Sequence, residues 1–141
     1  MRDDGSTTWS KLAARFAFHD LTHYVAETTL GCRNAFYGLI AQGWDIETFT
    51  AIDPATGTRP ELPAEANQIE GLITTLQSQL WNGASYEEIV GLWEMSCASF
   101  GLPPPRLTPE QLDTIRERLR ACWEQWKLLP AGGVLELPFP G

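Results

Sequence analysis

The sequence predicts a mainly helical domain of the α+β kind, with about five packed helices and a small antiparallel sheet formed by N- and C-terminal strands. Apolar residues recur every three or four positions over most of residues 64–126, and capping residues stand immediately before these segments. Short segments of strand character near the two ends of the chain predict the sheet. The 141 residues, of which 43% are hydrophobic, suit a single domain over residues 1–141.

The N-terminal residues are predicted to be extended. A turn dipeptide, Asp4-Gly5, precedes residues 7–9, whose threonines and tryptophan favour a strand. Phe16 and Phe18 flank an alanine, which suits a second short extended piece. Near the other end, residues 134–137 alternate between apolar and polar and predict the partner strand.

Two short helices are expected next. The first begins near His19 or Asp20, where a carboxylate would meet the free amides of a first turn, and ends at Gly31. The second spans about residues 33–42 and ends at Gly43, a residue suited to the left-handed conformation past a helix C-terminus. Because their connection is short, we expect the two helices to be antiparallel neighbours.

Three longer helices follow a loop at residues 53–63, which contains three prolines. Helical spacing predicts the first over residues 64–81, and capping boxes open the other two, at residues 85–100 and 108–126. The apolar stripes of these helices place several large side chains in the core: Trp81, Leu92, Trp93, Trp123 and Trp126.

The composition excludes some partners. A formal net charge of −8 disfavours nucleic acid and anionic membranes, because both would be repelled at long range. The three cysteines are far apart and odd in number, which is typical of free thiols in a reducing compartment. With no signal peptide and no apolar run long enough to span a membrane, the sequence predicts a cytoplasmic protein.

The two histidines of the chain indicate a metal site. His19 and His23 are four residues apart, so on a helix they stack along one face. Two imidazoles one turn apart can bind a single metal ion, as they do in the H-E-x-x-H helix of zinc hydrolases. We therefore expect a divalent transition metal, with zinc as the first choice.

A catalytic zinc site needs at least one further protein ligand. Asp45 is the first choice, because the second helix would span about 15 Å and bring the chain back to the His19 end of the first helix. Glu47 is the alternative with the longer side chain.

Two other carboxylates are candidate catalytic groups. Asp20 follows His19, in the place where those hydrolases have a glutamate that acts as general base, and its side chain is shorter. Glu27 lies two turns beyond His19, roughly 12 Å along a helix axis, which is too far to share one ion. It could instead accept a hydrogen bond from His23 and fix the tautomer of that imidazole.

Three interpretations of the cluster remain open on these residues. The first is a small intracellular metal-binding protein, and more specifically a metal-dependent hydrolase. The second is a polar active or binding cleft without a metal. The third is a non-catalytic binding or interaction module in which the histidines and Glu27 form a structural cluster. A small molecule or a peptide would be the ligand, and the sequence does not indicate an oligomeric state.

The run from Phe18 to Asp45 contains HDLTHYVAE, then LG, then GLIAQGWD. In these motifs the chain resembles a group of short bacterial proteins of unknown function, over roughly its first third and more faintly at the C-terminal LEL segment. The resemblance implies no activity. It implies that residues 19–27 and the Trp44-Asp45 pair belong to one feature.

Overall fold

The regular structure of the described residues is entirely helical. The computed structural model describes residues 14–44, 54–57, 62–103 and 106–130. Its helices are α1 (Ala14–Leu30), α2 (Phe36–Ala41), α3 (Ala64–Gln79), α4 (Tyr86–Ser99) and α5 (Pro109–Lys127). The mainly helical class is therefore confirmed. The expected strands at residues 7–9 and 134–137 lie outside the described ranges, so the sheet stays a prediction.

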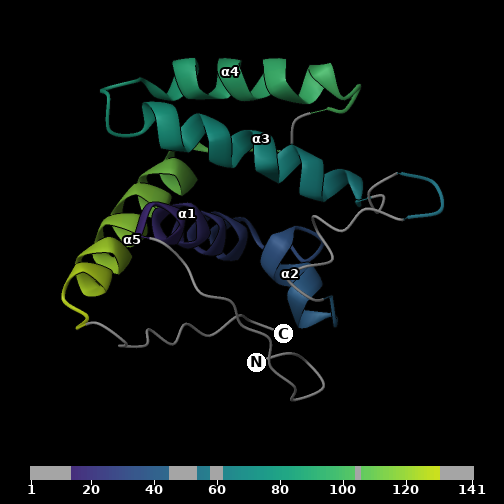
Figure 1. The fold of residues 1–141 in the computed structure, drawn as a ribbon. Helices are drawn as coiled ribbons and strands as arrows, with labels where there is room; N and C mark the ends of the chain where they lie inside the picture. The colour runs from purple at the N-terminus through teal and green to yellow at the C-terminus, as the bar shows by residue number, and fades with distance from the viewer. Residues whose placement is uncertain (1–13, 45–53, 58–61, 104–105, 131–141) are drawn as a thin grey trace.

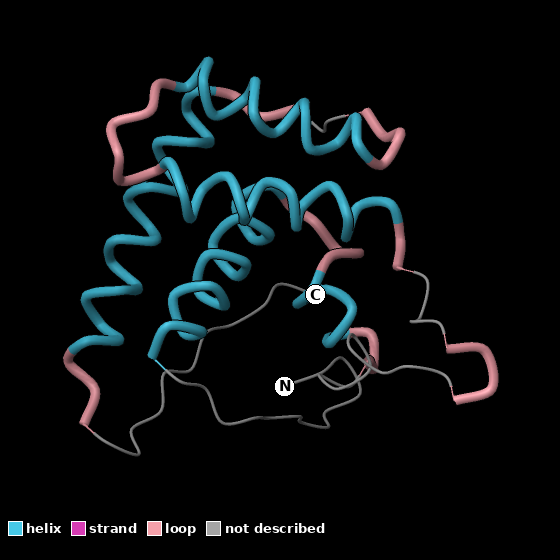
Figure 2. Tube along the Cα trace, turned by 45° about the horizontal axis from the view of Figure 1, so that its top comes forward, coloured by secondary structure: helices cyan, strands magenta, loops and turns pink. Residues whose placement is uncertain are grey.

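Helix α1 lies at the centre of the arrangement. It packs against α3 and α5, whose contacts with α1 run from Phe18 to Thr29, and against α2, which follows its C-terminal end (Figure 1). Helix α4 packs on α3 and remains the outermost helix in the second view (Figure 2). The candidate site lies on the face of α1 that packs against α3, where His23 is buried and His19 is partly exposed.

The N-terminal start of α1 corrects two expectations. The helix begins at Ala14, so residues 16–18 are helical rather than extended, and Asp20 lies in the second turn rather than the first. Phe18 shares a helix face with Leu21 and Val25, and its ring packs edge-to-face against Trp123 of α5, 5.2 Å between centroids. The contact between Phe18 and α5 therefore favours a helix at residues 16–18. It outweighs the alternation of apolar side chains, which covers only three residues.

The ends of the helices follow the signals in the sequence. Both capping boxes are present: Ser85 and Glu88 exchange side-chain bonds to each other's backbone amides, and Thr108 and Gln111 do the same. Gly31, with φ of 72°, ends α1 as expected. Helix α2 is shorter than predicted and lacks a side-chain cap at its start, which explains why its first residue was misplaced.

The core contains apolar residues from α1, α3, α4 and α5. Trp93 is buried, and its indole Nε1–H donates a hydrogen bond of 2.7 Å to the carbonyl of Gln68. Trp123 and Trp126 are partly buried against this core, as expected. Two core assignments were wrong, because Trp81 is 44% exposed and Leu92 41% exposed. Trp81 lies past the end of α3, and the stripe predicted for α4 is wider than the face that packs on α3.

Candidate metal centre

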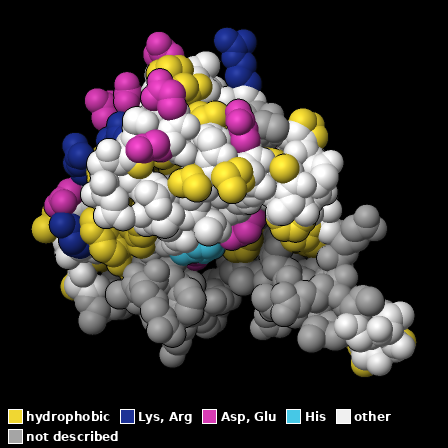
Figure 3. Space-filling view, turned by 90° about the horizontal axis from the view of Figure 1, so that it is seen from above, with side chains coloured by type: hydrophobic (Ala, Val, Ile, Leu, Met, Phe, Trp, Pro, Cys, Tyr) yellow, Lys and Arg dark blue, Asp and Glu magenta, His cyan; other side chains and the backbone are white. Residues whose placement is uncertain are grey.

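Three side chains from two helices meet between α1 and α3. His19 and His23 stand one turn apart on α1, with ring centroids 4.7 Å apart, and Glu70 of α3 lies opposite them. His23 is 3% exposed, whereas the side chain of Glu70 is 53% exposed. The cluster is therefore closed on its His23 side and open on its Glu70 side. Figure 3 shows a histidine surface beside an acidic side chain on this open side.

The Glu70 carboxylate links the two imidazoles. Its Oε2 lies 3.0 Å from Nε2 of His23, and its Oε1 lies 3.7 Å from Nε2 of His19. All three potential ligand atoms lie within 4.8 Å of one another. Two atoms that bind a tetrahedral zinc ion are about 3.4 Å apart, since each bond is about 2.1 Å long. The residues thus fit a metal ion after side-chain movements of about an ångström.

The other nitrogen of each imidazole is held by a side-chain oxygen. Nδ1 of His23 lies 3.1 Å from Oε2 of Glu27, and Nδ1 of His19 lies 3.1 Å from Oε1 of Gln77. Because both oxygens are acceptors, each Nδ1 is the protonated donor, and each Nε2 is left to face Glu70. Metal-binding histidines are oriented in this way by partners behind them. The hydrogen bond expected between His23 and Glu27 is confirmed.

Glu27 connects the cluster to α2. It is fully buried, and its second oxygen, Oε1, accepts hydrogen bonds from the backbone amides of Tyr37 at 2.9 Å and Gly38 at 3.3 Å. Both amides lie in the first turn of α2, where backbone donors have no partner within the helix. Both oxygens of Glu27 are therefore used in bonds on the buried side of the cluster. This arrangement favours a positioning role for Glu27.

The charges in the cluster shift the pKa values of its members. Burial alone would lower the pKa of His23, but hydrogen bonds to Glu27 and Glu70 outweigh burial and raise the pKa to about 9. Burial acts to raise the pKa of Glu70, yet the hydrogen bond and charge of His23 bring that pKa below its usual value. Without a metal, the raised pKa of His23 and the lowered pKa of Glu70 therefore favour an imidazolium paired with the Glu70 carboxylate.

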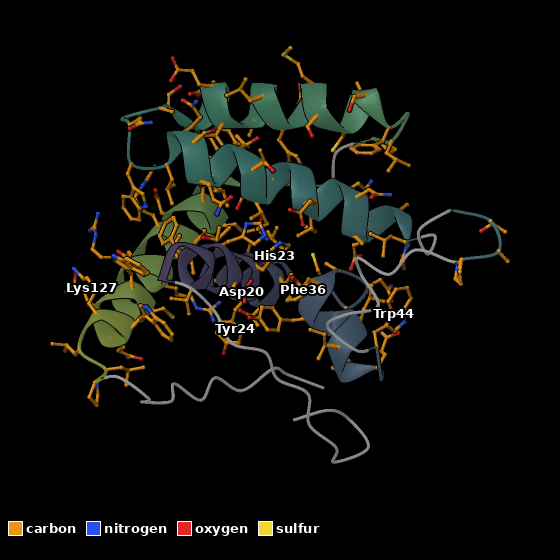
Figure 4. All side chains as sticks on the ribbon, in the orientation of Figure 1. Asp20, His23, Tyr24, Phe36, Trp44 and Lys127 are labelled. Atoms are coloured by element: carbon orange, nitrogen blue, oxygen red, sulfur yellow. The ribbon has the colours of Figure 1, made fainter. Side chains whose placement is uncertain are left out.

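Asp20 is near the histidines and half-buried. Burial raises the pKa of its carboxyl, against the opposing charges of His19 and His23. In Figure 4, His23 lies between α1 and α3, while Asp20 lies farther from α3. Asp20 is thus a carboxyl at the edge of the cluster rather than one of the groups that meet at its centre.

The expected third ligand differs from the one that the described residues provide. Asp45 and Glu47 lie outside the described ranges, so their approach to the histidines stays a prediction. Glu70 occupies the third position in the described structure and was not anticipated. A weak signal was present, because Glu70 and Gln77 are seven residues apart and so lie on one face of a predicted helix.

The cysteines do not join this centre. All three are free thiols, as expected, and Cys32 is buried beside Glu65 and Glu27. Burial and these carboxylates raise the pKa of the Cys32 thiol to about 12, which disfavours a nucleophilic thiolate. No helix in the described ranges is both long and apolar enough to cross a bilayer.

The comparisons with known proteins leave the site to be interpreted from its own geometry. The chain matches no protein-family model, no curated protein and no solved structure.

Proposed function

We propose that this protein binds one divalent transition-metal ion, zinc in the first place, through Nε2 of His19, Nε2 of His23 and the carboxylate of Glu70. One observation supports this most strongly. Each Nδ1 is held from behind by a side-chain oxygen, and both Nε2 atoms turn toward the same carboxylate. Two imidazoles and one carboxylate form the donor set of zinc sites that keep a position open for water.

We further propose hydrolysis as the reaction, in a cytoplasmic setting. A zinc ion at such a site supplies Lewis acidity, which brings the pKa of bound water close to neutral. In this proposal, Glu27 and Gln77 orient the imidazoles, and Asp20 is the candidate general base. Asp20 supports this role by its place, because it is half-buried beside His19 and interacts electrostatically with both histidines.

The second candidate is a non-catalytic binding or interaction module. The chain of bonds from Glu27 through His23 to Glu70 supports it, because each polar atom of the buried imidazole already has a partner. In that case the cluster ties α1 to α3 and, through Glu27, to α2. Removal of Glu70 would then lower stability and leave zinc uptake unaffected.

A competition titration separates the two candidates. Tag-free protein, freed of metal with a chelator, is titrated with zinc against a chromophoric chelator of known affinity. We expect uptake of about one equivalent, and in Glu70→Gln an affinity lower by about tenfold or more, since one of three ligands is lost. Glu94→Gln, a matched change on the exposed face of α4, should bind like the unaltered chain.

Two results would overturn the metal proposal: uptake below about a tenth of an equivalent, or an unchanged affinity in Glu70→Gln. Hydrolysis is tested separately with Asp20→Asn in zinc-loaded protein. There we expect slower turnover by about a hundredfold with zinc affinity unchanged, as for loss of a general base. Equal turnover in that variant would remove Asp20 from the mechanism.

A further inference from the structure

An aromatic groove lies at the end of the molecule where α1 begins, α3 ends and α5 passes. It has a volume of about 470 Å³ and is lined by Phe18, Trp81, Arg120, Trp123 and Glu124. This volume is within the range of small-molecule sites, which are mostly apolar with a few polar groups.

The groove adjoins the histidine cluster through two helices. Phe18 immediately precedes His19 on α1, and Gln77, whose side chain hydrogen-bonds His19, lies one turn before Trp81. One helical turn corresponds to about 5.4 Å along the axis. Figure 3 shows the histidine surface on the same face as hydrophobic side chains to its left, the side where α5 lies in Figure 1. The groove and the cluster are therefore neighbours along α1 and α3.

The apolar part of the groove is suited to a flat ring. Phe18 and Trp123 pack edge-to-face at an interplanar angle of 78°, which fixes both rings. Trp81 also lines the groove and is 44% exposed, so a large part of its indole is available for contact. A ligand ring that lies against these side chains would gain both area burial and aromatic contacts.

The polar part of the groove is suited to an anion. The guanidinium of Arg120 lies 5.2 Å from the centroid of the Trp81 ring, which holds it over the groove. Glu124 also lines the groove, and its carboxylate pairs with Lys127 at 2.8 Å rather than with Arg120. Among the described residues, no carboxylate lies within 4.0 Å of Arg120. Its planar fork remains able to bind a carboxylate in a bidentate manner.

We propose that the groove binds the aromatic end of a small substrate that bears a carboxylate. The aromatic ring lies against Trp81 and Trp123, the carboxylate pairs with Arg120, and the bond to be hydrolysed extends toward His19 and His23. The last part rests on the proposed function. Binding in the groove does not, because it needs no metal.

Metal-free protein tests the groove by itself. The probes are 1-naphthaleneacetate and its neutral counterpart 1-naphthalenemethanol, titrated while the indole N–H signals of the tryptophans are followed by NMR. We expect the acid to bind about tenfold more tightly than the alcohol, because a carboxylate pairs with guanidinium and a hydroxyl does not. Arg120→Gln should abolish this preference, and Trp81→Ala should weaken both probes.

Both substituted residues are exposed, so the fold should survive, and thermal unfolding checks this. Arg116→Gln is the matched control, since Arg116 is on the same helix but pairs with Asp113. Arg120→Lys keeps the charge without the fork and should show an intermediate preference. Equal binding of acid and alcohol, or a preference that survives Arg120→Gln, would overturn the groove assignment.

A third probe tests the link to the metal centre: 2-(1-naphthylmethyl)succinate monohydroxamate, which has the ring, the carboxylate and a zinc-binding group. Zinc should tighten its binding by about tenfold or more, and naphthaleneacetate should respond far less. Groove binding without zinc uptake would leave the groove standing and end the proposed function. Zinc uptake without groove binding would leave the proposed function standing and end the groove assignment. Zinc uptake and groove binding without any coupling would overturn the claim that the groove serves the metal centre.

Discussion

His23 lies between two carboxylates whose exposure differs, and the difference separates their roles. Glu27 is fully buried and is fixed by the amides of Tyr37 and Gly38 as well as by the imidazole. Glu70 is 53% exposed, so its own carboxylate can be solvated when it moves, and an ion bound to Nε2 of His23 would replace it as the partner of that nitrogen. Glu27 orients the imidazole, and this role requires a rigid side chain. Glu70 is a proposed metal ligand, and it must be able to shift when the ion enters.

The stability of the metal-free protein should fall as the pH rises through the neutral range. His23 has a pKa of about 9 in the folded state and 6.5 as its ordinary value. Below pH 6.5, His23 is protonated in both the folded and the unfolded state, and its contribution to the free energy of unfolding is fully present. This contribution is lost as the pH rises through the folded-state pKa. Urea unfolding with a chelator present should show a loss of roughly 1–2 kcal/mol between about pH 6.5 and 8.5.

His23→Asn is the control for this dependence, because it removes the titrating group. Its stability should be lower and nearly flat over the same interval. A wild-type stability that stays constant or increases across the interval would show that His23 is not held as an imidazolium.

Glu27→Gln should weaken metal binding although Glu27 is not a proposed ligand. The amide oxygen can still accept one hydrogen bond, but the charge that orients His23 is lost. We expect zinc affinity to fall about 10- to 100-fold, as is usual when the partner of a ligating histidine is changed. The free energy of unfolding should fall by about 2 kcal/mol, because buried amide donors lose their charged acceptor. Glu94→Gln should change neither quantity, and an unchanged zinc affinity in Glu27→Gln would contradict the positioning role.

At the scale of residues, the sequence was informative about α1 and gave only a weak signal for the side chains of α3 that meet it. The bond from His23 to Glu27 follows from their spacing of four on one helix. Glu70 and Gln77 could not be assigned, because their approach to the histidines depends on how α3 packs against α1. That packing joins residues about fifty positions apart, and no local pattern encodes it.

At the scale of elements, α3 and α4 approach closely at a glycine. A Cβ on Gly71 would lie 2.4 Å from Oγ and 3.1 Å from Cβ of Ser96. Gly91 on α4 is different, because a Cβ there would meet nothing within 4 Å. The two glycines therefore separate the effect of packing from that of helix propensity.

Gly71→Ala should lower the free energy of unfolding by about 1–3 kcal/mol through overpacking. Gly91→Ala should raise it by about 0.5–1 kcal/mol, since alanine is the better helix former. Adding Ser96→Ala should restore part of the loss in Gly71→Ala by removing the nearest atom. Chemical denaturation measures all four chains. Equal effects at the two glycines would show that the close contact between α3 and α4 is not present in solution.

The sequence predicted the elements best where a chemical signal marks an end. The capping boxes at Ser85 and Thr108 located α4 and α5 almost to the residue, and helical spacing located α3. The start of α1 was wrong because no described cap marks it and its conformation depends on the contact between Phe18 and Trp123. Local patterns therefore give helix ends, and tertiary contacts decide the exceptions.

At the scale of the whole molecule, the proposed ion would join α1 to α3 and, through Glu27, to α2. Zinc should therefore stabilise the protein against global unfolding. At a free zinc concentration about 100 times the dissociation constant, the gain should be about 2.7 kcal/mol, provided that the unfolded chain binds zinc weakly. Thermal unfolding with and without zinc measures the gain. No shift in the wild type, or the same shift in Glu70→Gln, would contradict the link between the ion and the packing of these helices.

The position of the ion itself tests the central claim most directly. Crystals of the zinc-loaded protein, measured on both sides of the zinc absorption edge, give an anomalous difference map that locates the ion. The account predicts one dominant peak at about 2.0–2.2 Å from Nε2 of His19, Nε2 of His23 and a carboxylate oxygen of Glu70. A dominant peak at other residues, or none at this cluster in fully zinc-loaded crystals, would contradict the account.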